Sequence, residues 1–440
     1  MDIFSYFLRN YRLFHDIDHV SIGYGNPDTS RVRIVKSAGD DFWNKKSDID
    51  PQKPIWKKWK GVQIPFLFDQ DDSREIISDG EGHVSVNYDI VASAFYFLSG
   101  WNEYVNSCND LYGRAGYEQS MVKKLGVVRI PVVNYYFDIL HDAISQCGGK
   151  IFKRLWNDHA FAVALTHDID NCMSAWLEGS FSELKKGRFL SIPGLVLKRF
   201  LSEDDWFNFE LISSIEKQYE ARSTFFFLPE KGKKGRWKNA DYNIRSKKIR
   251  QVIRNLGDDG FETGVHGSFG THADAQKLAK ELAAIDTPSI IGNRFHFLMF
   301  DPGKTAGVLE KSGISYDASL GFAEHAGFRR GTCHPFYLYD FVRDQISAAL
   351  EIPLIVMDTT LRSKNYMGLA PGTALDEISG LMDEVKKFSG VFTLLWHNTS
   401  FSEYKFAGWK RVYLDILEYC KNNGAWMTTG RNIYEKITGK

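Results

Sequence analysis

The sequence predicts an α/β protein in which helices surround a parallel sheet. From residue 161 to the end of the chain, short apolar segments alternate with amphipathic ones. Such alternation is typical of a parallel sheet that is closed as a barrel or doubly wound. Residues 1–150 lack this rhythm and are rich in Asp, Tyr and turn residues. We therefore expect an α+β accessory domain over residues 1–150 and a β/α domain over residues 155–440.

The accessory domain is expected to mix short strands with helices. Residues 83–90 alternate apolar and polar side chains as a strand does, and residues 89–105 carry apolar side chains at helical spacing. A further helix is expected over residues 135–145. Gly148 and Gly149 then break the chain before the second domain.

The β/α domain is expected to alternate strands with helices in a regular order. Strands are expected at FAVALTHD (161–168), STFFFL (223–228), FETGVHG (261–267), SIIGNRFHF (289–297), EIPLIVMD (351–358) and VFTLLWHN (391–398). Helices are expected near residues 207–219, 246–256, 273–284 and 410–420. Residues 177–201 interrupt this rhythm, and we interpret them as a surface insertion.

Composition and hydropathy exclude several classes of function. Lys and Arg together number 55, and so do Asp and Glu. The chain therefore lacks the basic excess that is typical of proteins that bind nucleic acid or an anionic membrane surface. Its longest apolar stretch, residues 90–98, is far shorter than the roughly 20 residues that span a bilayer. We expect no nucleic-acid partner and no membrane span.

Cysteine usage and the first residues indicate the compartment. The five cysteines are scattered and form no C-x-x-C pair, which argues against a disulfide framework or a thiolate zinc site and favours a reducing compartment. The apolar residues near the amino terminus are interrupted by Asp2, Arg9 and Arg12, unlike those of a signal peptide. The expected location is the cytoplasm.

Two carboxylates stand where the first strand of the β/α domain ends. Active sites of α/β barrels lie at the carboxyl ends of the strands. Side chains alternate along a strand, so Asp168 and Asp170 are expected to point to one side and His167 to the other. Two neighbouring carboxylates repel each other unless a cation or a proton lies between them. The pair therefore indicates a site that binds a cation or transfers a proton.

Further polar side chains stand at the ends of later strands. His266 belongs to the third strand, Arg294 and His296 to the fourth, and His397 to the end of the last. Nitrogen and oxygen donors in this mixture suit Zn²⁺ or a related divalent ion. The sequence thus predicts a mononuclear metal site at one end of the sheet.

These motifs resemble the NodB-homology polysaccharide deacetylases, carbohydrate esterase family 4. The resemblance covers residues 155–440 and depends on THDID, STFFFL, ETGVHGSF, GNRFHF, YDASLG and LLWHN. It implies an irregular (β/α)7–8 barrel and metal-dependent removal of N-acetyl groups from a sugar in a glycan or glycan precursor. The segments FYFLSGWNEY (95–104) and DLYGR (110–114) resemble an uncharacterised domain found ahead of such deacetylase domains in bacteria.

The resemblance also implies a role for each candidate residue. Asp168 is the expected catalytic base and Arg294 the residue that orients it, whereas His397 is the expected general acid. Asp170 and His266 are expected to bind one divalent metal ion, with zinc favoured and cobalt, nickel or manganese left open. Thr224, Asp317 and Trp396 are expected to bind the substrate.

The second metal histidine departs from the family pattern H-x-x-x-H, because the fourth residue after His266 is Gly270. Two histidines could replace it. His272 lies two residues further along, in a loop or a first helical turn behind Thr271. His296 follows Arg294 at strand alternation, so both face the same side of the sheet. We favour His296, because a residue on a rigid strand meets the narrow distance range of a zinc ligand more readily.

Two other functions stay open. The same barrel could hydrolyse a non-sugar amide. A glycan-binding or scaffolding protein that has lost its metal is also compatible with the missing fourth-position histidine. The expected partner is an N-acetylated saccharide, and the oligomeric state does not follow from the sequence.

Overall fold

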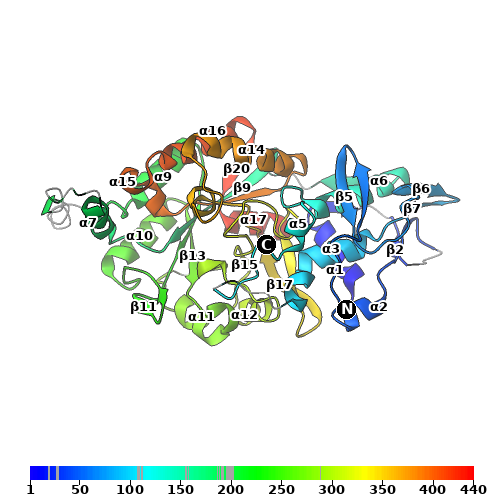
Figure 1. The fold of residues 1–440 in the computed structure, drawn as a ribbon, viewed down its shortest axis with the longest axis horizontal. Helices are drawn as coiled ribbons and strands as arrows, with labels where there is room; N and C mark the ends of the chain where they lie inside the picture. Colours follow the sequence, from blue (N-terminus) through cyan, green and yellow to red (C-terminus); the bar gives the residue numbers. More distant parts are fainter. Residues whose placement is uncertain are drawn as a thin grey trace.

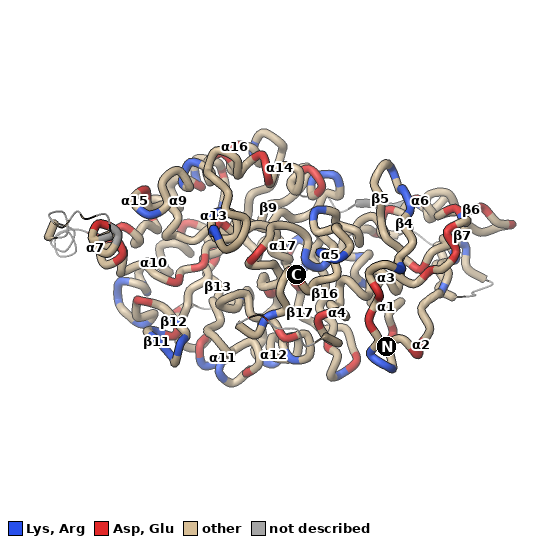
Figure 2. The backbone as a smooth tube through the Cα atoms, viewed as in Figure 1, with Lys and Arg blue, Asp and Glu red and all other residues tan. Residues whose placement is uncertain are grey.

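The computed structural model describes residues 1–17, 20–25, 29–106, 110, 112–153, 156, 158–185, 187, 189, 193–194, 203–287 and 289–440. The predicted α/β class is confirmed. The part after residue 160 holds one large sheet with helices around it, and the first 150 residues hold smaller sheets and helices (Figure 1). Lys and Arg are interspersed with Asp and Glu along the chain (Figure 2).

The large sheet has ten strands, of which all neighbours except one pair are parallel. They are β9 (Phe161–Ile169), β10 (Thr224–Phe227), β13 (Glu262–Gly267), β14 (Gly292–Phe295), β15 (Tyr316–Asp317), β16 (Phe336–Asp340), β17 (Gln345–Glu351), β18 (Val356–Met357), β19 (Val391–Leu395) and β20 (Ala425–Thr428). The hydrogen-bonded order is β16-β17-β15-β14-β13-β10-β9-β19-β18, with β20 also paired to β9. This pairing describes a curled half-barrel sheet whose edge strands are β16 and β18.

Helices follow most of the strands. They are α7 (Ala175–Lys185), α9 (Phe209–Gln218), α10 (Lys247–Asp258), α11 (Ala275–Leu282), α12 (Thr305–Lys311), α13 (Asp358–Arg362), α14 (Pro371–Lys387), α15 (Glu403–Phe406), α16 (Trp409–Asn422) and α17 (Gly430–Thr438), with 3-10 turns η2 (Thr271–Ala273), η3 (His296–Leu298) and η4 (Asn398–Phe401). The four helices that the sequence predicts are present as α9, α10, α11 and α16. Helix α10 shows the amphipathic pattern. Ser246 caps its first turn by accepting the Ile249 N–H, and Ile249, Ile253 and Leu256 bury one face.

The expected insertion over residues 177–201 is described without gaps only at its start. Its first part is helical and belongs to α7 (Ala175–Lys185). Residues 186, 188, 190–192 and 195–202 lie outside the described residues. A short basic hairpin, β11 (Lys233–Lys234) with β12 (Trp237–Lys238), lies between β10 and α10.

The accessory part is α+β, as the sequence predicts. It contains α1 (Ile3–Arg12), β1 (His15–Ile17), β2 (Ile22–Tyr24), β3 (Val32–Ile34), α2 (Asp40–Asn44), β4 (Ile55–Trp59), β5 (Val62–Phe66), β6 (Ile77–Gly80), β7 (His83–Val86), α3 (Ile90–Ser99), α4 (Trp101–Val105), α5 (Met121–Lys124), α6 (Val132–Gln146) and β8 (Ile151–Lys153). The single helix expected over residues 89–105 is two helices. Gly100 adopts φ 72 between α3 and α4, a left-handed conformation that glycine tolerates without strain.

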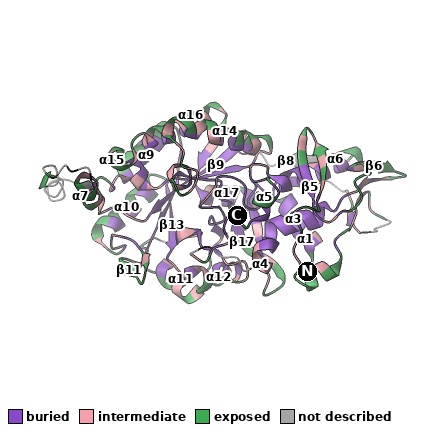
Figure 3. Cartoon of the chain, viewed as in Figure 1, coloured by how far each residue is buried: buried purple, intermediate pink, exposed green. Residues whose placement is uncertain are grey.

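The two parts share one hydrophobic core, and buried residues run through both (Figure 3). The hairpin of β16 and β17, which the sequence analysis did not predict, brings the large sheet against α1 and α3. The ring of Tyr6 lies edge-on to that of Tyr339 at 5.4 Å, and its hydroxyl donates to the Tyr337 carbonyl at 2.8 Å. The accessory part is therefore packed on the sheet rather than connected only through a linker.

Parallel pairing brings the carboxyl ends of the central strands to one edge of the sheet. Asp168 pairs in register with Phe226 of β10, and His266 of β13 pairs with Arg294 of β14. Met357 of β18 pairs with Leu395 of β19 in the same way. The polar residues at and just beyond these strand ends therefore gather in one region, as the fold class requires. No described helix is long and apolar enough to cross a membrane.

Candidate metal and catalytic site

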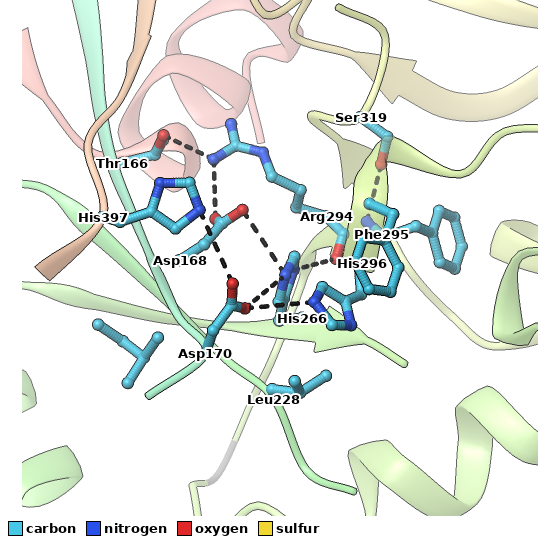
Figure 4. A network of polar contacts seen from close by, with 12 residues as sticks. Thr166, Asp168, Asp170, Leu228, His266, Arg294, Phe295, His296, Ser319 and His397 are labelled. Atoms are coloured by element: carbon cyan, nitrogen blue, oxygen red, sulfur yellow. Dashed lines mark hydrogen bonds and ion pairs between the residues drawn. The ribbon is translucent and has the colours of Figure 1, made fainter. Parts of the chain in front are cut away.

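Asp168 in β9 and Asp170 just after its end both project into one cluster of polar side chains (Figure 4). His167, which precedes Asp168, points to the other side of β9. Its Nδ1 donates to the Trp396 carbonyl at 2.6 Å, and its Nε2 lies 2.7 Å from Glu216. The predicted alternation is thus observed, and it separates His167 from the cluster.

Asp168 is held by a buried arginine. Arg294 Nη1 lies 3.0 Å from Asp168 Oδ1 and also donates to Thr166 Oγ1 at 2.7 Å. Its Nε donates to the Ala318 carbonyl at 2.8 Å, and the arginine is completely buried. These bonds fix the guanidinium, so Asp168 Oδ1 has one orientation while Oδ2 faces the cluster, 3.7 Å from His266 Nε2.

Asp170, His266 and His296 form a group that could hold a metal ion. Asp170 Oδ1 lies 3.3 Å from His266 Nε2 and 3.6 Å from His296 Nε2. Two ligands of a tetrahedral zinc ion, each about 2.0–2.1 Å from it, lie roughly 3.4 Å apart. Asp170 Oδ1 is buried and makes no hydrogen bond with the described residues. The spacing, and the lack of a hydrogen bond to this buried oxygen, therefore fit a shared cation.

Hydrogen bonds, burial and neighbouring charges act differently on the three side chains. Burial lowers the pKa of His266, but Asp168 and Asp170 outweigh this effect and raise it. His266 Nδ1 donates to the Arg294 carbonyl at 2.9 Å, which leaves Nε2 directed at the aspartates. Burial lowers the pKa of His296 to about 4, so its ring is neutral near pH 7. Burial would raise the pKa of Asp170, but the neighbouring His296, His266 and His397 hold it well below its usual value. Asp170 is therefore a carboxylate.

His397 lies beside this group and is held by an aspartate. Its Nδ1 lies 2.7 Å from Asp358 Oδ1, and its Nε2 lies 3.8 Å from Asp170 Oδ2. Burial lowers the pKa of His397, but Asp358 outweighs this effect and raises the pKa to about 9. Arg362 Nη1 lies 3.0 Å from the other oxygen of Asp358. Asp358 was not among the site residues predicted from the sequence, although it ends the expected strand EIPLIVMD and so follows the same strand-end rule.

The two candidates for the second metal histidine are clearly separated. His296 joins Asp170 and His266, whereas His272 belongs to the 3-10 turn η2 and lies outside that group. One part of the expectation was wrong. Strand β14 ends at Phe295, so His296 begins a 3-10 turn instead of extending the strand. The turn continues through Phe297 and Leu298, whose φ values of 61° and 55° are left-handed.

The polar cluster opens into a cleft of about 480 Å³. Asp168, Asp170, His266, His296 and His397 all line it. The wall around them contains residues of both parts of the chain, among them Tyr112, Arg114, Trp206, Lys238, Phe297, Arg362, Tyr366 and Lys405. A pocket with convergent polar groups and perturbed pKa values is the default candidate for an active site.

The three expected substrate contacts are buried outside the described lining of this cleft. Thr224 is the first residue of β10, at the opposite end of the strand, and its hydroxyl donates to Glu262 at 2.7 Å. Asp317 accepts hydrogen bonds from Asn293 at 2.6 Å and Ser319 at 2.9 Å. Trp396 packs on aromatic rings of α16. Strand alternation turns Trp396 away from the side of His397.

Comparisons with known proteins concern the two parts separately. Residues 3–148 match the model of a family of unknown function (DUF7033). This match confirms the expectation of an uncharacterised domain ahead of the β/α domain. A comparison with curated proteins finds no match for the sequence.

Solved structures to which the chain is similar include polysaccharide deacetylases. A Mycobacterium smegmatis protein assigned as a polysaccharide deacetylase is 18% identical, with 64% of this chain and 92% of that chain covered and a TM-score of 0.43. The PuuE allantoinase is 13% identical over 65% of this chain and 93% of its own, with a TM-score of 0.44. A family 4 carbohydrate esterase pseudoenzyme from Bacillus anthracis is 14% identical over 62% and 66%, with a TM-score of 0.29.

Proposed function

We propose that the chain is a metal-dependent hydrolase that removes N-acetyl groups from a sugar in a glycan or glycan precursor. One observation carries this proposal. An aspartate with a buried arginine, a group of one aspartate and two histidines, and a histidine with its own aspartate converge in a single cleft. These are the parts that hydrolysis of an amide needs: a base, a cation site and an acid.

The proposed cofactor is one divalent ion, with zinc favoured over cobalt, nickel or manganese. Asp170, His266 and His296 would hold it through one carboxylate oxygen and two ring nitrogens, a donor set that suits zinc. When bound, such an ion polarises the amide carbonyl and acidifies a water molecule. The Arg294 carbonyl orients His266 for this role by accepting its Nδ1 proton.

Asp168 is the proposed general base. Its Oδ1 is occupied by Arg294, and its Oδ2 faces the cluster. A carboxylate that is held at one oxygen can accept the proton of the attacking water at the other. Arg294 holds the carboxylate in this orientation through a charge-assisted hydrogen bond.

His397 is the proposed general acid. Asp358 accepts the Nδ1 proton, which directs Nε2 into the cleft and supports the protonated ring. An amine leaves an amide only when its nitrogen is protonated, so an acid must be within reach of that nitrogen. Asp358 is a positioning residue in this assignment.

The substrate proposal depends on the wall of the cleft. Tyr112, Trp206, Phe297 and Tyr366 line it together with charged and amide side chains. Aromatic faces bordered by a few placed polar groups suit a ligand with both apolar and hydroxyl-bearing faces. A sugar ring has both.

We extend the proposal to the architecture: residues 155–440 form an irregular (β/α)7–8 barrel, residues 1–150 form the accessory domain, and the location is the cytoplasm.

The test combines metal analysis with product analysis on the full chain. Mass spectrometry of the purified protein is expected to find about one equivalent of a divalent ion per chain. Incubation with N-acetylglucosamine oligomers is expected to release acetate and a free amine, and dialysis against a chelator is expected to abolish this release. If the protein hydrolyses only non-sugar amides, these amides replace the sugar as the proposed substrate class. A chain that binds glycans but takes up no metal would be a binding protein.

A further inference from the structure

Two residues of the accessory domain line the cleft that contains the metal group. Tyr112 and Arg114 belong to the DLYGR segment, and they share the wall with Asp170, His266 and His296. Residues 3–148 have no assigned role. The position of Tyr112 and Arg114 in the cleft wall indicates that one segment of the accessory domain contributes to the site.

Asp110 organises a turn that contains Tyr112, Gly113 and Arg114. Asp110 Oδ1 accepts the backbone N–H of Tyr112 at 2.8 Å and that of Arg114 at 2.9 Å. Gly113 adopts φ 86 in this turn, which glycine tolerates without strain. Asp110 Oδ2 also accepts from Arg114 Nε at 2.8 Å and lies 2.7 Å from Nη2. Nε and Nη2 of the guanidinium therefore both bind the Asp110 carboxylate, and Nη1 is left to bind another group.

Arg114 Nη1 donates to the Phe297 carbonyl at 2.7 Å, in the turn that begins with His296. That turn is strained, because Phe297 and Leu298 both adopt left-handed φ values of 61° and 55°. A backbone of this kind persists only where surrounding contacts hold it. Arg114 supplies a charge-assisted contact to the centre of the turn.

Ring contacts connect the same residues. The Phe297 ring stacks on the His296 ring at 3.8 Å, and the Tyr112 ring lies 5.2 Å from the Phe297 ring. The accessory turn thus makes two contacts with Phe297: Arg114 binds the Phe297 carbonyl, and Tyr112 contacts the Phe297 ring. The Phe297 ring also contacts His296. His296 has no hydrogen bond at Nδ1 among the described residues. Its orientation therefore depends on these packing contacts.

We infer that the accessory domain is a structural part of the metal site. Arg114 is a positioning residue: it holds the turn of His296, Phe297 and Leu298, and through that turn it directs His296 Nε2 at Asp170. The inference rests on the proposed function only in taking Asp170, His266 and His296 as metal ligands. Groups that orient metal ligands typically contribute 10- to 100-fold to metal affinity, so the contribution of Arg114 is expected to be about 10-fold or more.

A second arginine of the accessory domain offers a matched control. Arg129 Nη2 donates to the Glu377 carbonyl at 2.7 Å, and its Nη1 lies 2.6 Å from the Glu377 carboxylate. Like Arg114, it joins the accessory part to a backbone carbonyl of the β/α part. Arg129 is absent from the described lining of the cleft. Its removal therefore tests contact between the two parts without touching the turn.

The experiment uses full-length apoprotein of wild type, Arg114→Met, Arg114→Lys and Arg129→Met. Zinc affinity is measured by competition with a chromophoric chelator, and cobalt is added to record the visible absorption of the substituted site. We expect Arg114→Met to weaken zinc binding about 10-fold or more and to change the cobalt spectrum. Arg114→Lys, which keeps a cationic donor, is expected to recover part of the affinity. Arg129→Met is expected to match wild type.

The outcomes separate this inference from the proposed function. If wild type and Arg114→Met bind zinc equally well and give the same cobalt spectrum, this inference is overturned but the proposed function is not. Equal losses in Arg114→Met and Arg129→Met also overturn it, because they indicate general docking. A wild type that takes up no zinc overturns both. Thermal unfolding of each apoprotein is recorded. If Arg114→Met is unfolded, Arg114→Lys is compared with Arg129→Met instead. A weaker zinc affinity of Arg114→Lys then supports the inference, and an equal affinity overturns it.

Discussion

Arg294 Nη1 lies 3.0 Å from Asp168 Oδ1, and both side chains are buried. An arginine at this distance fixes one oxygen of the carboxylate through a charge-assisted hydrogen bond. The neighbouring carboxylate, Asp170, instead faces histidine rings. The two aspartates therefore have different surroundings, and the proposed division into base and metal ligand follows from that difference.

Asp168→Asn is expected to reduce amide hydrolysis by about 10² to 10⁴, because asparagine keeps the shape of the side chain but cannot accept the proton. Zinc content is expected to stay at the wild-type level, since Asp168 is outside the proposed ligand group. Steady-state rates on an accepted substrate and metal analysis measure both. Asp170→Ala is the companion variant and is expected to lose zinc as well. Wild-type turnover in Asp168→Asn would contradict the assigned role.

His397→Ala is expected to distinguish between leaving groups. Amide hydrolysis is expected to fall by about 10² to 10⁴, because the departing amine needs a proton. An activated aryl acetate ester is expected to lose much less, since a phenolate leaves without protonation. The measurement is kcat/KM for both substrates in both proteins. Equal losses on the two substrates would indicate a structural or binding role for His397.

His296→Ala and His272→Ala are expected to differ in metal content. His296 Nε2 lies 3.6 Å from Asp170 Oδ1, whereas His272 lies in a separate 3-10 turn outside the ligand group. We expect His296→Ala to lose most of its zinc and His272→Ala to keep about one equivalent per chain. Mass spectrometry of the purified variants measures this. An empty site in His272→Ala beside a full one in His296→Ala would reverse the assignment.

Glu351→Gln is expected to change how stability depends on pH. Burial, followed by the charge of Asp317, raises the pKa of Glu351 well above its usual value in the folded chain. The folded state therefore holds a proton that the unfolded state releases. The stabilisation from that proton is complete below the unfolded pKa and is lost as pH rises towards the folded pKa. The slope reaches at most about 1.4 kcal/mol per pH unit.

The glutamine keeps the shape of Glu351 but does not titrate, so its free energy of unfolding is expected to lack this decline. Denaturant unfolding at several values between pH 5 and pH 8 measures the difference from wild type. Glu377→Gln, at a carboxylate whose side chain is 40% exposed, serves as the control and is expected to follow wild type. Parallel curves for Glu351→Gln and wild type would contradict the prediction.

Alternation along strands made part of the site predictable. It correctly put the side chains of Asp168 and Asp170 together and that of His167 on the other side of β9. Proximity in sequence was not sufficient elsewhere. Trp396 is adjacent to His397 but faces the opposite side, and Thr224 begins its strand rather than ending it. Being near a catalytic motif does not establish which way a side chain points.

The remaining parts of the site depend on contacts between segments far apart in sequence. Asp358 lies 39 residues before its partner His397, and Arg114 lies 183 residues before the Phe297 carbonyl. The left-handed turn at Phe297 contains no glycine, the residue that usually indicates such a conformation in a sequence. No local pattern encodes such contacts, because the first arises when β18 pairs with β19 and the second when the accessory part packs against the sheet.

The sequence by itself determined the α/β class, the strand ends that carry the chemistry and the identity of the polar groups there. These follow from local rules, since hydrophobic period and side-chain alternation act over a few residues. Tertiary structure alone decided that His296 and not His272 joins Asp170 and His266, that Asp358 holds His397, and that Arg114 contacts the turn of His296. These outcomes depend on distances of a few ångströms between strands, turns and domains, and only the packed chain sets such distances.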